Sequence, residues 1–118
     1  MIIRTAVALS MLICASPAWA KPKHATQTGV ASWYGAHWAG RKTASGERFN
    51  PHHLTAASRS LPMGTRLLVS YGRRHVTVKI NDRGPYIRGR VLDLSEAAAS
   101  RLGIKNSGAA KVKMRVLG

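Results

Sequence analysis

Carboxylates are scarce in this chain, and three of them stand where they could do chemistry. Only four of the 118 residues are acidic, against 19 Lys and Arg. Glu47 lies between two turn signals, Asp82 follows an apolar run directly before Gly84-Pro85, and Asp93 precedes a predicted helix. Cleavage of a glycosidic bond needs a carboxylic acid to protonate the leaving oxygen, and usually a second carboxylate as base or charge stabiliser. These three residues are therefore candidates for carboxylate chemistry.

Each carboxylate also has a purely structural interpretation. Glu47 could pair with Arg41 or Arg48 at the surface, as most exposed acids do. Asp93 could instead bond the N-terminus of the helix that follows it. Composition and turn chemistry alone leave both interpretations open.

The residue pattern gives little support to metal or nucleophile chemistry. The five His residues show no ligand spacing such as HxxxH or HExxH, and Cys14 is the one Cys. Neither a G-x-S-x-G elbow nor a phosphate-binding loop is present. We therefore expect no metal site and no cofactor.

Aromatic residues gather in one short stretch. Trp33, Tyr34 and Trp38 lie beside glycines, in a chain with only three Trp, three Tyr and one Phe. Sugar rings stack on aromatic faces, and a Tyr hydroxyl or a Trp N–H can bond sugar hydroxyls. The stretch is thus either part of the core or the lining of a glycan-binding groove.

Short strands must position these side chains. Apolar and alternating runs predict strands over residues 29–35, 65–71, 75–80 and 111–116, with a tight turn at 72–74 that makes the middle two a hairpin. Residues 54–60 fit a strand or a helical turn equally well. Ser95 as N-cap and Gly103 as stop predict the one clear helix. The pattern indicates an all-β protein, a small β-barrel with one or two short helices.

The N-terminus has the features of a secretory signal. Arg4 gives a positive start, an apolar run follows, and Ala18-Trp19-Ala20 supplies a cleavage pattern, so we expect a signal peptide over residues 1–20. Lipidation at Cys14 is the less favoured alternative. Residues 21–28 read as a flexible lead-in and residues 29–118 as the barrel domain. The apolar run is shorter than the about 20 residues that span a bilayer, so we expect no transmembrane segment in the mature chain.

The charge predicts an anionic neighbourhood. Without Arg4 the mature chain has 18 basic and 4 acidic residues, a formal charge of +14. An exported protein meets anionic envelope polymers rather than nucleic acid, so we expect the former as partners. We expect a monomer in the periplasm or cell envelope.

Three stretches, read together, resemble a known family. They are GVASWYG at 29–35, RKTASGERFNPHHLTAASRSLPMGT at 41–65, and VTVKINDRGPYIRGRVLDLSEAAASRLG at 76–103. These motifs, in this order, are similar to those of the rare lipoprotein A family of bacterial envelope proteins. The resemblance implies a six-stranded double-psi β-barrel, as in the first domain of expansins, and action on peptidoglycan glycan strands.

The resemblance also implies roles for individual residues. Glu47 and Asp82 match the family's motif carboxylates and are expected to be catalytic. The residues expected to bind substrate are the aromatic and polar side chains near them: Trp33, Tyr34, Trp38, Asn81, Arg83, Tyr86 and Asp93. The implied reaction is that of a lytic transglycosylase, which cleaves the MurNAc–GlcNAc bond of peptide-poor strands and leaves a 1,6-anhydro product.

Two positions depart from the family pattern. Many members have Asp where this chain has Asn50, and His where it has Ser58. The alternative to an enzyme is therefore a non-catalytic, expansin-like module that binds peptidoglycan and loosens the wall. A third possibility is a basic envelope protein that uses charge without a groove.

Overall fold

The computed structural model describes residues 25–118. The predicted signal peptide, Cys14 and the first part of the predicted lead-in lie outside these residues. Within them, no helix is long and apolar enough to cross a membrane.

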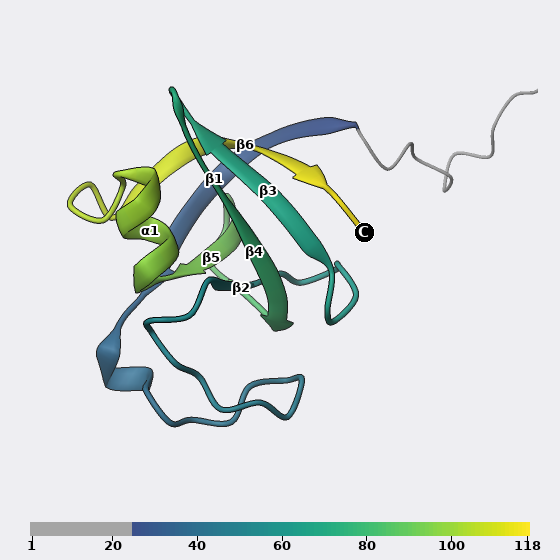
Figure 1. Ribbon diagram of the computed structural model, residues 1–118, viewed down its shortest axis with the longest axis vertical. Coiled ribbons are helices and arrows are strands. Elements are labelled where there is room, and N and C mark those ends of the chain that lie inside the picture. The colour runs from purple at the N-terminus through teal and green to yellow at the C-terminus, as the bar shows by residue number, and fades with distance from the viewer. Residues whose placement is uncertain (1–24) are drawn as a thin grey trace, which may run out of the picture.

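Six strands close into a barrel in the order β1-β5-β2-β4-β3-β6 (Figure 1). The strands are β1 Thr26–Tyr34, β2 Thr55–Ala57, β3 Arg66–Tyr71, β4 Arg74–Asp82, β5 Arg90–Ser95 and β6 Ala109–Val116. A 3₁₀ turn, Ala36–Trp38, follows β1, and the helix α1, Glu96–Leu102, follows β5. The predicted all-β barrel with one or two short helices is confirmed.

The barrel mixes parallel and antiparallel pairs. β1 pairs with β5, and β2 with β4, in parallel; all other neighbours are antiparallel. The predicted hairpin is β3–β4, and its turn contains Gly72 at a φ of 60°, which a residue with a side chain rarely adopts. The ambiguous segment 54–60 contains the short strand β2.

β1 begins earlier than the predicted strand. Thr26–Thr28 pair with Lys113–Arg115 of β6, so they belong to the sheet although they fall within the predicted lead-in. This pairing is the reason that a polar stretch without apolar periodicity is ordered as strand.

Alternate strand residues fill the barrel with a single core. Val76, Val78 and Ile80 of β4 are buried, as their alternation predicted. The other large side chains that are almost completely buried are Leu67, Val69, Leu92, Leu94, Leu102, Ile104 and Val112. Burying these apolar surfaces is the main stabilising contribution in a chain whose described part has no Cys.

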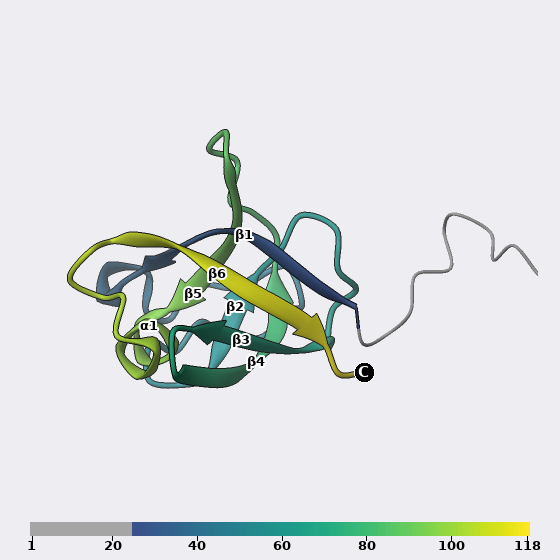
Figure 2. The same cartoon turned by 90° about the horizontal axis from the view of Figure 1, so that it is seen from above.

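Helix α1 forms as its capping residues predict and lies against β4, β5 and β1. The Ser95 hydroxyl accepts a hydrogen bond from the Ala98 N–H at 3.3 Å, and Gly103 ends the helix at a φ of 78°. Between β4 and β5 the chain forms a loop that stands away from the barrel (Figure 2). This loop and the long connection from β1 to β2 supply much of the site described next.

Candidate active site

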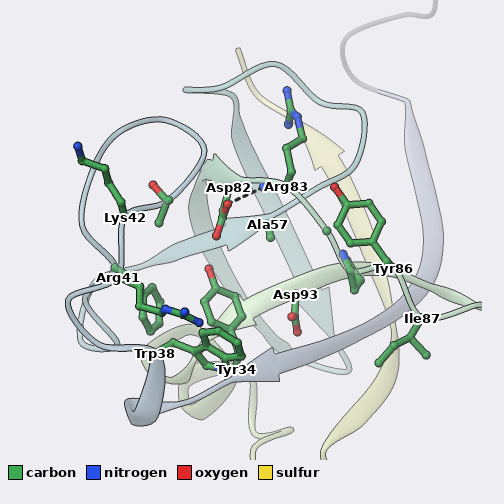
Figure 3. A pocket seen from close by; sticks show the side chains of 14 residues that line it. Tyr34, Trp38, Arg41, Lys42, Ala57, Asp82, Arg83, Tyr86, Ile87 and Asp93 are labelled. Atoms are coloured by element: carbon green, nitrogen blue, oxygen red, sulfur yellow. Dashed lines mark hydrogen bonds between the residues drawn. The ribbon is translucent and has the colours of Figure 1, made fainter.

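A groove of about 580 Å³ opens where β4 ends, between the β1–β2 connection and the β4–β5 loop (Figure 3). Its lining combines two carboxylates, four aromatic rings and three cations with small and apolar residues. The lining residues are Tyr34, Trp38, Arg41, Lys42, Thr43, Phe49, Ala57, Asp82, Arg83, Gly84, Pro85, Tyr86, Ile87 and Asp93.

Four strands bring the two carboxylates to one row. Ser32 of β1 is paired with Asp93 of β5, Asp93 with Ala57 of β2, and Ala57 with Asp82 of β4. The register of β2 against β4 shifts here, so that Ala56 pairs with Ile80 but Ala57 pairs with Asp82. Asp82 and Asp93 are therefore separated by a single small side chain.

Asp82 is fixed by backbone groups. Its Oδ1 accepts hydrogen bonds from the N–H groups of Ala44, at 3.0 Å, and Arg83, at 2.8 Å. The Ala44 bond ties the β1–β2 connection to the end of β4. Because Oδ1 is occupied, Oδ2 is the oxygen left for a ligand in the groove.

Asp93 has an environment that favours its protonated form. Burial raises the pKa of the Asp93 carboxyl, the hydrogen bond from Ser32 and the charge of Arg90 lower it in part, and the charge of Asp82 raises it again. The Ser32 hydroxyl donates to Oδ1 at 2.9 Å. Asp93 thus keeps a proton to higher pH than an ordinary Asp.

Tyr34 points its hydroxyl toward Asp82 in the groove (Figure 3). The phenolic oxygen is buried and has no hydrogen-bond partner in the described chain. Burial, then the charges of Asp82 and Asp93, raise the Tyr34 pKa, so the hydroxyl stays protonated. Its ring stacks on Phe49 at a centroid distance of 4.5 Å. Tyr34 therefore presents an unused hydrogen-bond donor and acceptor.

The two walls of the groove carry exposed rings. Trp38 lies on one side, with the Arg41 guanidinium 4.8 Å from its ring centroid. Tyr86 and Ile87 project from the β4–β5 loop on the other side (Figure 3) and are 78% and 57% exposed. Large apolar surfaces left open beside carboxylates suit the flat CH faces of sugar rings.

Arg83 lines the groove and also braces it. Its guanidinium donates to the carbonyl oxygens of Ser58 at 3.0 Å and Leu61 at 2.7 Å. The Ser58 hydroxyl accepts from the N–H groups of Ser60 and Leu61. Ser58, which stands where many family members have His, is therefore buried in a turn and does not line the groove.

Glu47 lies on a turn beside the groove, but it is not part of the lining. Its Oε2 accepts a 2.9 Å hydrogen bond from Lys79, and its Oε1 a 3.2 Å bond from Ser45. The bond from Lys79, together with the bond from Ser45, holds the pKa of the exposed Glu47 carboxyl below its usual range. The predicted partner, Arg41 or Arg48, is replaced by Lys79. Glu47 therefore loses its proton more readily than an ordinary Glu, which suits the role of a carboxylate better than that of a proton donor.

Two residues expected to bind substrate, and the departing position Asn50, also lie outside the groove. Trp33 packs against the core, one of the two interpretations that the sequence left open, and its indole N–H donates to the carbonyl of Lys105 at 3.0 Å. Asn81 is buried, and its backbone carbonyl oxygen accepts a hydrogen bond from the Ser45 N–H. Asn50 accepts a bond from the His52 N–H in its own turn. These residues shape the loops around the site.

Several lining residues were not predicted. Arg41, Lys42, Thr43 and Phe49 come from the β1–β2 connection, and Ala57 from β2. Their spacing along the sequence gave no signal, because it is the fold of the connection and the strand register that bring them to the groove. Within residues 25–118, no group of three or more His, Cys, Asp or Glu is placed to hold a metal ion.

The architecture is that of a double-psi β-barrel. A Streptomyces papain inhibitor superimposes with a TM-score of 0.68 at 22% identity, covering 82% of this chain and 98% of that one. An expansin of Clavibacter michiganensis superimposes with a TM-score of 0.66 at 24% identity, covering 80% of this chain and 51% of that one. Because the identities are only 22% and 24%, the structural likeness establishes the fold alone.

The chain belongs to the lytic transglycolase family, whose model matches residues 26–114. The probable endolytic peptidoglycan transglycosylase RlpA of Nostoc sp. is 58% identical over 94 residues, 76% of this chain and 25% of that protein. The endolytic peptidoglycan transglycosylase RlpA of Campylobacter jejuni is 47% identical over 95 residues, 79% and 34% respectively. The chain thus spans only about a quarter to a third of these relatives.

Proposed function

We propose that this chain is an exported, monomeric lytic transglycosylase that cleaves the MurNAc–GlcNAc bond of peptide-poor peptidoglycan strands and releases 1,6-anhydro-MurNAc ends. Family membership and the names of its relatives support the reaction class. The observation that carries the proposal is the row in which Asp82 and Asp93 face one groove across Ala57.

The groove fits a glycan better than a compact ligand. It has aromatic side chains on both walls and hydrogen-bonding groups between them. Sugar rings are bound in this way, with CH faces on aromatic rings and hydroxyls on polar groups. Trp38 and Tyr86 form the walls in the proposed complex. A shift of the Tyr34 ring exposes its buried hydroxyl, which then bonds a sugar oxygen from below.

The proposed reaction needs no water. Asp93, whose pKa is raised by burial, acts in its protonated form and donates that proton to the oxygen between MurNAc and GlcNAc. The bond from this oxygen to C1 of MurNAc breaks, and the C6 hydroxyl closes on C1. Asp82 takes the proton that the C6 hydroxyl loses. Both carboxyls then regain their starting states by proton exchange with solvent.

Glu47 completes the set as the carboxylate with the lowered pKa. Positive charge develops at C1 in the transition state of glycosidic cleavage. The lowered pKa of Glu47 keeps its charge available, and the exposed ion pair with Lys79 is of a kind that contributes little to stability. In the proposed complex the carboxylate leaves Lys79 and turns to the sugar at the edge of the groove.

The second candidate is a non-catalytic, expansin-like module that binds peptidoglycan. It is favoured by the position of Glu47 outside the groove lining and by Ser58, whose hydroxyl is used within its own turn. In that case the groove binds a glycan strand and leaves it intact.

One experiment separates the two candidates. Peptide-free glycan strands are incubated with the chain, and the products are analysed by mass spectrometry for 1,6-anhydro-MurNAc ends. An enzyme yields such ends, and Asp82→Asn yields them about a thousandfold more slowly. Retained binding without anhydro products, at high protein concentration and over long incubation, establishes the binding module instead.

A further inference from the structure

Each of the four acidic residues either pairs with a Lys or lies in the groove, and none of these positions is on the strongly basic face described next. Glu47 pairs with Lys79, and Glu96 with Lys105, while Asp82 and Asp93 lie in the groove. Within residues 25–118, most Lys and Arg therefore have no acidic partner. Wherever these cations gather, their field is therefore not neutralised within the chain.

Such a gathering lies on the outer side of β6. Lys111, Lys113 and Arg115 are exposed, while Val112 between them is buried, so the three cations share one face of the strand. We call them the β6 strip. Alternate residues of a strand are about 6.6–6.8 Å apart along the backbone, so the three cations follow one another at regular intervals along β6.

The neighbours of the β6 strip add hydrogen-bonding groups. β6 lies between β1 and β3 on this face (Figure 2). Lys113 is flanked by Thr28 of β1 and Ser70 of β3, and Arg115 by Thr26 of β1. A shallow depression of about 190 Å³ is lined by Thr26, Leu68, Ser70, Lys113, Met114 and Arg115. Two cations and two hydroxyls thus surround one hollow.

We propose that the β6 strip binds a linear, base-free phosphodiester polymer, such as a chain of polyol phosphate units, with one phosphate seated in this depression. A regular row of cations matches a polymer that repeats its charge at every short unit. Hydroxyl donors beside Lys113 and Arg115 suit the unbridged oxygens of a phosphate.

The surroundings of the strip favour this polymer over nucleic acid. Proteins that bind single-stranded nucleic acid stack bases on aromatic side chains. None of the residues that line the depression is aromatic. The ligand is therefore held by its phosphates alone.

The strip acts separately from the groove. β6 contributes no residue to the groove lining, and the strip shares no residue with it. A polymer on the strip leaves the glycan site free, so the protein can be retained on one polymer while it acts on another. The inference does not depend on whether the groove cleaves its glycan.

Binding of fluorescently labelled poly(glycerol phosphate) to the chain, measured by anisotropy over a range of salt concentrations, tests the proposal. The test variant is Lys111→Gln/Lys113→Gln/Arg115→Gln. The control variant, Arg73→Gln/Arg88→Gln/Arg101→Gln, removes the same charge from exposed positions elsewhere. Circular dichroism establishes that both variants are folded.

The test variant is expected to bind roughly a hundredfold more weakly at low salt, from the usual contribution of three basic residues at an anionic surface. Its plot of log affinity against log salt should be shallower than that of the wild type by about 2, the value for three phosphate contacts. The control variant should bind within a few-fold of the wild type.

Three outcomes overturn the proposal. Equal losses in both variants mean that net charge alone attracts the polymer. Tighter binding of single-stranded DNA than of poly(glycerol phosphate) of equal phosphate number means that bases are read. Strip-dependent binding to peptide-bearing peptidoglycan, without binding to the phosphate polymer, means that the strip recognises carboxylates.

Discussion

Asp93 in the groove and Glu47 on the neighbouring turn are carboxylates in opposite settings. Asp93 is half-buried, its pKa is raised by that burial, and its one side-chain partner is the neutral hydroxyl of Ser32. Glu47 is exposed, its pKa is lowered, and its first partner is the cation of Lys79. One chain therefore provides one carboxyl with a raised pKa and one with a lowered pKa.

The comparison shows how a very basic protein can still hold a carboxyl with a raised pKa. Nearby cations lower the pKa of a carboxyl, so a surface rich in Lys and Arg would be expected to ionise every acid. Burial within the row of Ser32, Asp93 and Ala57 outweighs this effect at Asp93. The two environments differ in exposure, since Glu47 is exposed and Asp93 is half-buried.

The largest expected effect is on the groove side of the comparison. Asp82→Asn should lower the rate of anhydro product formation about a thousandfold, within the range for loss of a general acid or base. The backbone hydrogen bond from Ala44 can still be accepted by the amide oxygen, so the fold should persist. Product formation by mass spectrometry and circular dichroism measure the two consequences. A rate within tenfold of the wild type would remove Asp82 from the chemistry.

Glu47→Gln tests the exposed side and should cost less, about a hundredfold, at the low end of the same range. Its matched control is Lys79→Met, which keeps the carboxylate but removes the main cause of its lowered pKa. In Lys79→Met the pKa of Glu47 should be higher than in the wild type. Because Glu47 must be ionised to act, the variant should lose activity at a higher pH than the wild type as the solution is acidified. Rates as a function of pH measure this shift. Unchanged activity in Glu47→Gln would assign Glu47 a structural role.

Tyr34→Phe separates activity from stability. The phenol is buried without a partner, so its loss should leave the free energy of unfolding unchanged or raise it by up to about 1 kcal/mol. The rate should drop about tenfold, as one hydrogen bond to the sugar is lost. Thermal unfolding and product formation are measured on the same preparation. A drop in stability would show that the hydroxyl has a partner within the fold.

The smallest expected effect is a shift of the pH profile in Ser32→Ala. The Ser32 hydrogen bond lowers the pKa of Asp93, so its removal should raise that pKa further. Asp93 must be protonated to act as acid, and activity is therefore lost as the pH rises through its pKa. The alkaline limb of the profile should move to higher pH. A limb that does not move would show that another group supplies the proton.

The sequence predicted the parts of the barrel that depend on local pattern. The alternation of Val76, Val78 and Ile80 identified β4, and Ser95 and Gly103 marked the helix. β2 was ambiguous because all three of its residues are buried, so it shows no alternation. The parallel pairs join segments far apart in the chain, and no local pattern encodes them.

The site, like the barrel, was predictable only where residue type and local pattern carry the information. Asp82, Tyr34, Trp38, Arg83, Tyr86 and Asp93 were predicted at the site and line the groove. Adjacent residues of a strand face opposite sides, so only one of Trp33 and Tyr34 could reach it, and the register of β1 decides which. The pairing of Glu47 with Lys79 depends on where the turn lies against β4, and neither residue type reveals it.

The row from Ser32 through Asp93 and Ala57 to Asp82 has a consequence for folding. Its members come from four strands, and two of its three contacts are between parallel strands that lie far apart along the chain. Such contacts form late, because long loops must close before they are made. A partly folded chain can hold the β3–β4 hairpin and still have no groove. Recovery of catalytic activity during refolding should therefore report closure of the barrel, and should lag behind the appearance of secondary structure.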